Sequence, residues 1–297
     1  MVDYRLMSLL KVVETGSFTR ASVQLGLSQP VVSQHIRQLE EYWKVKIFEH
    51  AHNRFTLTPE GKLIVRYAQR MAALSAQLKQ ALKNEKEQIH SLTIGITPTA
   101  ESSAIIEALA AYTNGLDKMN LKILTNTTEN LYGMLRSYEL DFAFVEGKSA
   151  DPAFRYMMLD TDCLVLAVPP AHPLAKQRMI TVDQLKKEKL ILRPPNSNTR
   201  RLFSASLETQ GLKVDDFNVV MEIDSIASIK DLIRRGFGVS ILARSACMDE
   251  IKKEKLAALS VENLSMIQEI NIVYLKDYEH TDLLIGIVKQ YNGMQRK

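Results

Sequence analysis

The chain has 297 residues, of which 46% are hydrophobic and 24% are charged, and its formal net charge is +4. This length predicts about two domains, and the composition is ordinary for a globular protein. There is no apolar run near the roughly 18 residues of a membrane span and no basic-plus-apolar signal at the N-terminus, so we expect a cytoplasmic protein. Cys163 and Cys247 have no metal-ligand spacing and imply no disulfide framework, which favours buried, reduced thiols.

Charge is divided unevenly along the chain. Residues 1–90 hold 13 Lys and Arg against 8 Asp and Glu, a net charge of +5, and residues 91–297 hold the remaining 25 against 26, a net charge of −1. A basic first third indicates a polyanion as the partner of that part. A solvated basic surface would give the same numbers, so charge alone leaves both interpretations open.

Three short helices are predicted at the start of the chain. The first carries apolar residues at helical spacing and is followed by Gly16. Ser17 is placed to cap a second helix, Gly26 supplies a left-handed stop, and Ser28 is placed to cap a third. Pro30 is tolerated there because the first-turn N–H groups have no intrahelical partner. The apolar positions of the first two helices are Leu6, Leu9, Leu10, Val13, Ala21 and Leu25.

The third helix has two different faces. One is an apolar stripe, and the other presents amide, hydroxyl and guanidinium groups that can read base edges in the major groove of DNA. This is the helix-turn-helix arrangement, with the second helix of the motif as the reader. A helical hairpin with a solvated polar face is the alternative. The stripe is Val32, Ile36 and Leu39, and the polar face is Gln29, Pro30, Ser33, Gln34 and Arg37.

A hairpin and a long helix are predicted next. The segment KIFEHAHNRFTLT, residues 46–58, alternates apolar residues around a polar loop and predicts a small wing. Arg54 at its tip is a candidate for the minor groove or a phosphate, with a solvated arginine as the alternative. From Pro59, a heptad pattern predicts a helix that pairs with a copy of itself, or is buried within one domain. The seam is Ile64, Tyr67, Met71, Leu74, Leu78 and Ala81.

From Ser91 the pattern changes to short apolar runs that alternate with helical stretches. The expected strands are LTIGIT, LKILTN, LDFAFV, CLVLAV, LIL, NVVMEI, GVSIL and INIVYL, and helices are expected to begin near Glu101, Glu129, Thr199, Ser225, Arg244 and Thr281. This alternation predicts a mostly parallel α/β architecture. An α/β enzyme is the competing class, but the sequence has no Walker loop, G-x-G-x-x-G, G-x-S-x-G or H-E-x-x-H motif. His172, in PPAHPLA, has no carboxylate or Cys partner in its motif and is interpreted as a turn residue.

The chain resembles the LysR-type transcriptional regulators. The family pattern of the winged helix-turn-helix is matched at Gly16-Ser17-Phe18-Thr19, Ala21, Leu25, Ser28-Gln29-Pro30, Val32-Ser33, Ile36, Leu39-Glu40, Phe48, Leu57-Thr58 and Gly61. Two places differ: Trp43-Lys44 stands for the usual Leu-Gly, and Ile47-Phe48-Glu49-His50 for Leu-Phe-x-Arg. The first replaces a glycine stop, and the second removes one phosphate contact. Neither touches the reader face.

The second part of the chain is similar to the effector-binding half of the same family, in LTIGIT, LDFAFVEG, AHPLAKQRMITVDQL, ILRPPNSNTRR and MEIDSIASIKDLIRRGFGVSILARSA. The resemblance implies a winged helix-turn-helix over 1–58, a linker and dimerisation helix over 59–90, and a regulatory domain over 91–297. That domain has two α/β subdomains of the type 2 periplasmic-binding-protein kind, I at about 91–161 and 267–297, and II at about 162–266. The chain crosses near Asp162 and near Met266.

The resemblance also implies an effector cleft between the subdomains. Its residues are Thr97, Pro98, Thr99, Glu101, Ser102, Glu146, Asn196, Ser197, Asn198, Thr199, Asp224 and Ser225. Several helix N-termini would meet there, which suits a carboxylate, sulfate or phosphate group. Ser102, Thr199 and Ser225 could equally be caps only. A Glu146 facing the cleft would favour an ammonium, so we expect an amine-bearing carboxylate; a Glu146 facing solvent, or paired with Arg155 or Arg193, removes that argument.

The expected function is therefore a sequence-specific transcriptional regulator, not an enzyme, with no cofactor other than its effector. Ser17, Thr19, Arg20 and Arg54 are candidates for phosphate or wing contacts, and the reader face for base contacts. The resemblance implies a dimer or tetramer on a near-palindromic promoter site, with RNA polymerase as a further partner. A ligand-independent DNA-binding protein and an α/β enzyme with a helical head are the alternatives.

Overall fold

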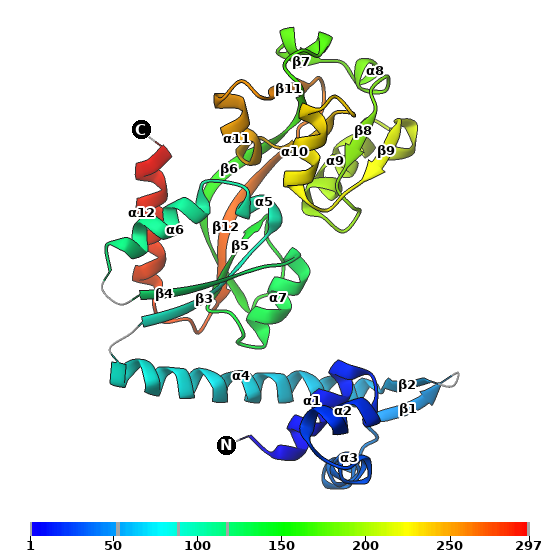
Figure 1. Ribbon diagram of the computed structural model, residues 1–297, viewed down its shortest axis with the longest axis vertical. Helices are drawn as coiled ribbons and strands as arrows, with labels where there is room; N and C mark the ends of the chain where they lie inside the picture. Colours follow the sequence, from blue (N-terminus) through cyan, green and yellow to red (C-terminus); the bar gives the residue numbers. More distant parts are fainter. Residues whose placement is uncertain (1, 52–53, 88–89, 117–118, 296–297) are drawn as a thin grey trace. The chain divides into compact units, whose positions relative to one another are not determined.

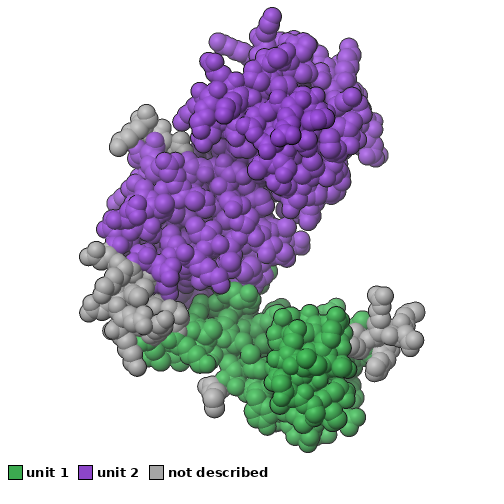
Figure 2. Space-filling view, in the orientation of Figure 1, with its two compact units in different colours: residues 1–90, 136–139 green, residues 91–135, 140–297 purple. Residues whose placement is uncertain are grey.

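The computed structural model describes the whole chain except residues 1, 52–53, 88–89, 117–118 and 296–297. The chain divides into two compact units (Figure 2), one formed by residues 1–90 with 136–139 and the other by 91–135 with 140–297. Within the described residues, no helix is both long enough and apolar enough to cross a membrane.

The first unit is a winged helix-turn-helix followed by one long helix. Its elements are α1 (Tyr4–Thr15), α2 (Phe18–Leu25), α3 (Gln29–Trp43), β1 (Phe48–Ala51), β2 (Arg54–Leu57) and α4 (Pro59–Glu87). Strands β1 and β2 pair antiparallel and form the predicted wing. The larger core joins stripes of α1, α3 and α4 to Ile47, which lies just before the wing: Leu6, Leu9, Ile36, Leu39, Ile47, Val65 and Ala68. A smaller cluster of Val12, Ala21 and Val32 joins α2 to α1 and α3.

The turn between α2 and α3 follows the predicted chemistry with one difference. Gly26 lies in the left-handed region, with φ at +66°, and its N–H bonds to carbonyls of α2. Ser17 caps α2 by accepting the N–H of Arg20. Ser28 stands at the cap position of α3, but its side chain makes no capping hydrogen bond. The hydroxyl of Ser28 is exposed at the start of the reader helix.

Lys44 keeps the turn that glycine would make. Its φ is 56° and its N–H bonds to the carbonyl of Glu40, so the backbone adopts the left-handed stop despite the Cβ atom. The carboxylate of Glu40 completes the corner, since it accepts the N–H of Ile47 at 2.8 Å and pairs with Lys46 at 3.1 Å. The unusual Trp43-Lys44 pair therefore leaves the path into the wing intact, at a cost in backbone strain.

The second unit has helices on both faces of a sheet and a second, smaller layer. Its strands are β3 (His90–Ile96), β4 (Met119–Thr125), β5 (Phe142–Glu146), β6 (Phe154–Val168), β7 (Met179–Ile180), β8 (Leu190–Leu192), β9 (Val219–Glu222), β10 (Ser240–Ala243), β11 (Ala257–Val261) and β12 (Ile267–Leu275). Its helices are α5 (Pro98–Glu101), α6 (Ile105–Asn114), α7 (Thr128–Arg136), α8 (Val182–Leu185), α9 (Asn198–Glu208), α10 (Ile226–Arg234), α11 (Arg244–Lys252) and α12 (Thr281–Gln295), with short 3-10 turns at Pro173–Lys176 and Val214–Asp216.

The prediction of a mostly parallel sheet is wrong. β3 and β5 run parallel, as do β8 with β9 and β7 with β11, but β12 is antiparallel to both β5 and β6, and β6 is antiparallel to β10 and β11. The strand order of the large sheet is β4-β3-β5-β12-β6-β11-β7. The antiparallel pairs arise because β6 and β12 are long and pass from one subdomain to the other.

These two strands divide the core of the unit into two halves. β6 pairs with β12 over 154–163 and with β10 and β11 over 164–168. One half takes its buried residues from 164–266, and the other half takes them from 94–145, 154–159 and 270–291. The expected two-subdomain α/β architecture is confirmed, and Figure 1 shows β6 and β12 running between the two halves.

Strand β5 positions the cleft. Phe142 and Phe144 pack in the core with α6 and α12, and Ala143 and Val145 pack in the core with α7, so successive side chains go to opposite faces of the sheet. Figure 1 shows α6 with α12 and α7 on these two sides. Glu146 is the last residue of β5, and the neighbouring strands β3 and β4 end just before α5 and α7 begin.

Candidate functional site

The reader face of α3 lies at the surface of the first unit. Gln29, Pro30, Gln34 and Arg37 are exposed and Ser33 is half-buried. The amide Nε2 of Gln29 donates to the hydroxyl of Ser33 at 2.9 Å. This contact between residues four apart orients the amide before any partner arrives, and leaves its oxygen and one N–H for a base edge.

The candidate phosphate contacts surround this face. Thr19 and Arg20 are exposed at the start of α2, while the hydroxyl of Ser17 accepts the N–H of Arg20 at 3.3 Å. Arg54 opens β2, but its side chain lies outside the described residues. Ser28 is a further exposed hydroxyl at the N-terminus of α3, where helix N–H groups favour an anion.

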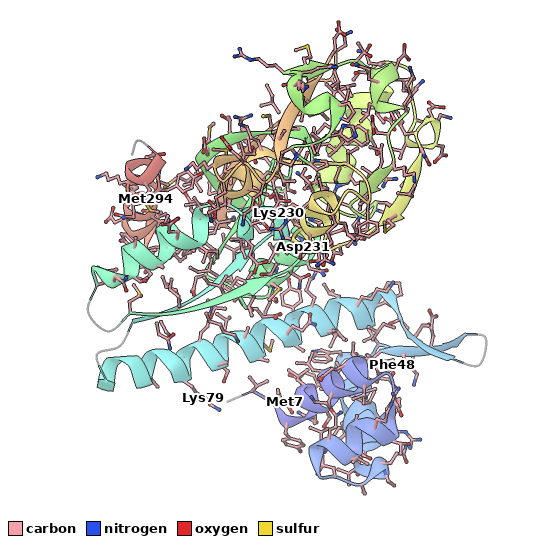
Figure 3. All side chains as sticks on the ribbon, turned by 45° about the horizontal axis from the view of Figure 1, so that its top comes forward. Met7, Phe48, Lys79, Lys230, Asp231 and Met294 are labelled. Carbon is pink, nitrogen blue, oxygen red and sulfur yellow. The ribbon has the colours of Figure 1, made fainter. Side chains whose placement is uncertain are left out.

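Contacts that the sequence did not indicate hold α3 in place. His35 extends from α3 to α1, where its Nδ1 is 2.8 Å from the hydroxyl of buried Ser8 and its ring meets the edge of Tyr4 at 4.9 Å. Phe48, labelled in Figure 3, packs edge-on against Phe18 at 5.7 Å. These contacts tie the reader helix to α1 and the wing to α2, which fixes the geometry of the surface.

Helix α4 carries an exposed apolar stripe. Tyr67, Met71, Leu74 and Leu78 of the predicted seam are 49%, 48%, 47% and 61% exposed. Ile64 instead packs partly against the core of the first unit, and the side chain of Ala81 lies outside the described residues. Two residues that the heptad pattern did not select, Leu63 and Leu82, extend the stripe, at 46% and 58% exposed. An exposed row of this length is the feature of a helix that pairs.

An apolar groove of about 380 Å³ continues the stripe at its N-terminal end. Its lining is Leu6, Trp43, Val45, Glu60, Leu63, Ile64, Tyr67, Ala68 and Met71. Trp43 is the single tryptophan of the chain and is 36% exposed. The large side chain that departs from the family pattern thus forms one wall of this groove.

The second unit contains a polar cavity of about 210 Å³ beyond the end of β5. Eight of the residues expected in the effector cleft line it: Thr97, Pro98, Thr99, Glu146, Asn196, Ser197, Asn198 and Asp224. The structure thus brings together side chains from four separate segments of the chain. The volume is below the ~300–1,000 Å³ of sites for drug-sized ligands, which indicates a small ligand.

Four expected residues do not line this cavity. Glu101 is exposed at the end of α5, and the hydroxyl of Ser102 bonds to the carbonyl of Pro98 at 2.9 Å. Thr199 is buried, with its hydroxyl 3.4 Å from that of Thr99. Ser225 caps α10 by accepting the N–H of Ser228 at 3.2 Å. Of the three residues considered as caps, only Ser225 caps a helix N-terminus, because Thr97 caps α5 and Ser197 caps α9.

Five residues line the cavity that the sequence had not placed there: Thr125, Asn126, Thr127, Thr128 and Arg193. The first four run from the last residue of β4 to the first residue of α7, and β4 lies beside β3 in the sheet, so its end reaches the same edge as Thr97. The signal in the sequence was the polar run TNTT after an apolar strand. Arg193 follows β8 directly, and the sequence had considered it only as a possible partner of Glu146.

Glu146 faces the cavity and is almost completely buried, at 3% exposed. Its Oε1 accepts the hydroxyl of Thr97 at 2.6 Å, while its Oε2 has no hydrogen-bond partner among the described residues. Burial raises the pKa of this carboxyl, an effect that the Thr97 hydrogen bond and the charge of Arg193 oppose and the charge of Asp162 reinforces. Glu146 is therefore turned neither to solvent nor into an ion pair within the described chain.

Arg193 is equally buried, at 3% exposed. Its Nη2 pairs with Oδ1 of Asp224 at 2.6 Å, and Asp224 is itself largely in solvent. The Nε and Nη1 atoms have no hydrogen-bond partner among the described residues. A guanidinium with unused donors beside a polar cavity is suited to an anion, since its N–H groups match the spacing of two carboxylate oxygens.

Polar contacts join the two sides of the cleft. The hydroxyls of Thr99 and Thr199 meet at 3.4 Å, and Nδ2 of Asn198 donates to Oε1 of Gln268 at 3.1 Å. At the crossing of β6, Asp162 accepts the hydroxyl of Ser245 at 2.5 Å. In the part of the chain that the structure describes, no cluster of three His, Cys, Asp or Glu could hold a metal ion.

Comparisons with known proteins match both units. The family model described as the LysR substrate binding domain matches residues 85–289, and the one described as bacterial regulatory helix-turn-helix protein, lysR family, matches residues 4–62. The chain is similar to the HTH-type transcriptional regulator CysL of Bacillus subtilis (strain 168), with 27% identity over 284 residues that cover 93% of this chain and 92% of that protein.

Two solved structures show the same fold. Full-length CbnR in complex with its target DNA has a TM-score of 0.68 at 16% identity, and the similarity covers 98% of each chain. A full-length OxyR variant from Pseudomonas aeruginosa has a TM-score of 0.63 at 20% identity, covering 97% of this chain and 96% of that one. The similarity therefore extends over both units of the chain.

Proposed function

Since the chain belongs to the LysR family and is a LysR-type transcriptional regulator with a helix-turn-helix and an effector-binding domain, we propose that the exposed face of α3 reads its operator. The observation that carries this proposal is the row of polar side chains on a helix anchored through His35 and Ser8. Gln29 and Arg37 are matched to adenine and guanine edges, and Pro30 to a thymine methyl. Ser33 and Gln34 lie beside them.

Ser17, Thr19, Arg20 and Arg54 are proposed to contact phosphates or to serve the wing. Such contacts set the register on the duplex and add salt-dependent affinity without selecting a sequence. The surplus of basic residues in 1–90 supports this division of labour.

The test is selection of preferred duplexes from a random pool with the full-length chain. Gln29→Ala should lose preference at about one base position, worth about 1–3 kcal/mol, because an amide–adenine pair is removed. Arg54→Ala should weaken binding to all duplexes and lower the salt slope by about 1. Gln24→Ala, an exposed glutamine on α2, is the matched control. Equal loss on every duplex for Gln29→Ala would contradict its role as a base reader.

The exposed stripe of α4 is proposed to pair with the same stripe of a second copy. Two reader helices related by a two-fold axis call for a near-palindromic site with half-sites in successive major grooves. A tetramer of two such dimers is proposed from the family resemblance. Dimerisation places the stripe and the Trp43 groove out of water, which accounts for so many exposed apolar side chains on one helix.

The output is proposed to be transcription and not catalysis, in the cytoplasm, with RNA polymerase as the downstream partner. A ligand in the cavity acts only if it binds one arrangement of the regulatory domain better than another. A footprint on the preferred duplex, with and without each candidate ligand, distinguishes this regulator from a ligand-independent DNA-binding protein. In the latter case no ligand changes the footprint.

A further inference from the structure

We propose that the cavity beyond β5 binds a small metabolite that carries a carboxylate and an ammonium group, with Arg193 holding the carboxylate and Glu146 the ammonium. This inference rests on the proposed function, because it names the chemical class of the effector. It rests on three polar atoms that have no hydrogen-bond partner among the described residues: Oε2 of Glu146, and Nε and Nη1 of Arg193. Both side chains are 3% exposed and line the same cavity.

The anion end is assigned to Arg193. Its Nη2 is already used by Asp224, at 2.6 Å, but Nε and Nη1 donate to nothing among the described residues. Buried donors without partners are rare in folded proteins and call for an explanation. Nε and Nη1 lie on different edges of the guanidinium, so each is a separate free donor, and either can bind a carboxylate next to the start of α9 at Asn198.

The exposed position of Asp224 supports the assignment of the anion end to Arg193. Its carboxylate holds the guanidinium by one nitrogen only, and its side chain is 76% exposed, so water screens much of its charge. The guanidinium is therefore oriented without being neutralised by a buried partner. In a purely structural ion pair, the carboxylate would be buried together with the guanidinium.

The cation end is assigned to Glu146. Thr97 satisfies Oε1, and Oε2 is an unused acceptor that lies in the same enclosed lining. The groups whose charges act on this carboxyl are Arg193 and Asp162, which oppose one another in sign. A ligand ammonium would supply both the missing donor and the counter-charge that burial makes necessary.

The remainder of the cavity limits the effector further. Hydroxyl and amide groups dominate the lining, from Thr97, Thr99, Thr125 to Thr128, Asn196, Ser197 and Asn198. Such groups hydrogen-bond to polar substituents, and the described lining residues include no aromatic or large aliphatic side chain. With a volume of about 210 Å³, the site suits a compact, polar amine-bearing carboxylate rather than an aromatic acid.

The competing chemistry is a simple oxyanion. A protonated Glu146 donates a hydrogen bond, so sulfate, phosphate or a dicarboxylate without an amine could lie between it and Arg193. The two possibilities are separated by matched pairs of probes. The pairs are the twenty L-amino acids against sulfate and phosphate, L-glutamate against glutarate, and L-alanine against propionate and ethylamine.

The experiment is thermal shift followed by calorimetric titration of the full-length chain. At least one amino acid should raise Tm and bind at least ten-fold more tightly than its partner that lacks the amine or the carboxylate. Glu146→Gln should reduce that binding at least ten-fold and reduce the discrimination against the deaminated partner. Arg193→Met should abolish binding of the amino acid and of its deaminated partner alike.

Two control variants have the same substitutions outside the cavity. Glu107→Gln on α6 and Arg155→Met on β6 alter exposed side chains and should leave binding unchanged. Stability provides a readout that does not depend on which ligand is found. Without ligand, Glu146→Gln and Arg193→Met should be as stable as the wild type or more stable, since each removes a buried charged group that has polar atoms without hydrogen-bond partners among the described residues. A lower Tm in both would mean that these groups are structural.

Three results would overturn the proposal. They are binding of simple anions only, indifference of amino-acid binding to Glu146→Gln, and silence of the whole probe panel. None of them affects the role of the chain as a DNA-binding regulator, which is tested by duplex selection without ligand. Conversely, a wild-type chain that binds an amino acid but shows no preference among duplexes would refute the proposed reader face alone.

Discussion

Substitution of Leu74 by Ala tests the pairing surface of α4. Leu74 is 47% exposed, so pairing has about half of its side chain left to bury. Full burial of a leucine contributes about 1.5–3 kcal/mol, which makes roughly 0.7–1.5 kcal/mol per chain for this residue. A two-fold dimer contains the substitution twice, and the loss per dimer is therefore about 1.5–3 kcal/mol. The dissociation constant of the dimer should rise roughly 10- to 150-fold.

Sedimentation velocity over a range of chain concentrations measures this constant directly. The single tryptophan gives an independent signal, because pairing that covers the groove beside Trp43 should shift its emission to the blue as dimers form. Leu27→Ala, at 39% exposed in the turn before α3, is the matched control and should leave the constant unchanged. Equal dissociation constants for the wild type and Leu74→Ala, with Trp43 equally accessible to a quencher in monomer and dimer, would refute the reasoning.

Three further predictions concern the turn after α3, the buried glutamate and the reader pair. Lys44→Gly should raise the free energy of unfolding by about 0.5–1 kcal/mol, since relief of left-handed strain outweighs the added chain entropy; denaturation followed by Trp43 fluorescence measures it, and a decrease would be contrary to the expectation. The pKa of Glu146 is raised above its ordinary value of 4.5, so its charged form destabilises the fold at neutral pH, and that penalty is lost as the pH falls through the raised pKa towards 4.5. The advantage in Tm of Glu146→Gln over the wild type should therefore shrink from pH 7.5 to pH 5, whereas a constant difference would rule out this titration. Because Gln29 and Ser33 share a hydrogen bond, their alanine substitutions should be non-additive in duplex binding by about 0.5–1.5 kcal/mol, as a double-mutant cycle would reveal; strict additivity would mean that they act separately.

The reader helix could be predicted because its information is local. Val32, Ile36 and Leu39 recur at helical spacing and are all buried, so the opposite face had to be the exposed one. The same reasoning is less decisive at the start of the α4 seam. There the heptad pattern chose Ile64, but the adjacent core of the first unit draws Ile64 inwards and leaves Leu63 exposed.

The cavity could be predicted only in part, because it depends on strand order. Thr97 follows β3 and Glu146 ends β5, two strands recognisable from the sequence, and both residues line the site. The residues after β4 reach the same edge because β4 neighbours β3, and no local pattern gives that neighbour relation. Arg193 was not selected because an arginine is almost always expected in solvent, and its burial follows from tertiary packing alone.

The strands β7 and β11 were missed for a related reason. β7 has two residues, and β11, with Ala257 and Ser260, has little β-forming signal of its own. Both exist because they pair with strands that are already in place, β11 with β6 and β7 with β11. The antiparallel pairing of β12 likewise depends on topology. The direction of a strand is set by the end of the sheet at which the chain enters it, and no local sequence pattern gives that end.

The position of β12 between β5 and β6 also sets an order of events during synthesis of the chain. Residues 1–90 and the contiguous core of 164–266 can each assemble as soon as they leave the ribosome. The sheet of the remaining subdomain lacks its central strand until residues 267–275 are synthesised. Until then, the edge of β5 that pairs with β12 is uncovered. In a nascent chain the helix-turn-helix can therefore fold before the effector-binding domain is complete, and truncations near the C-terminus should lead to aggregation and proteolysis of the chain.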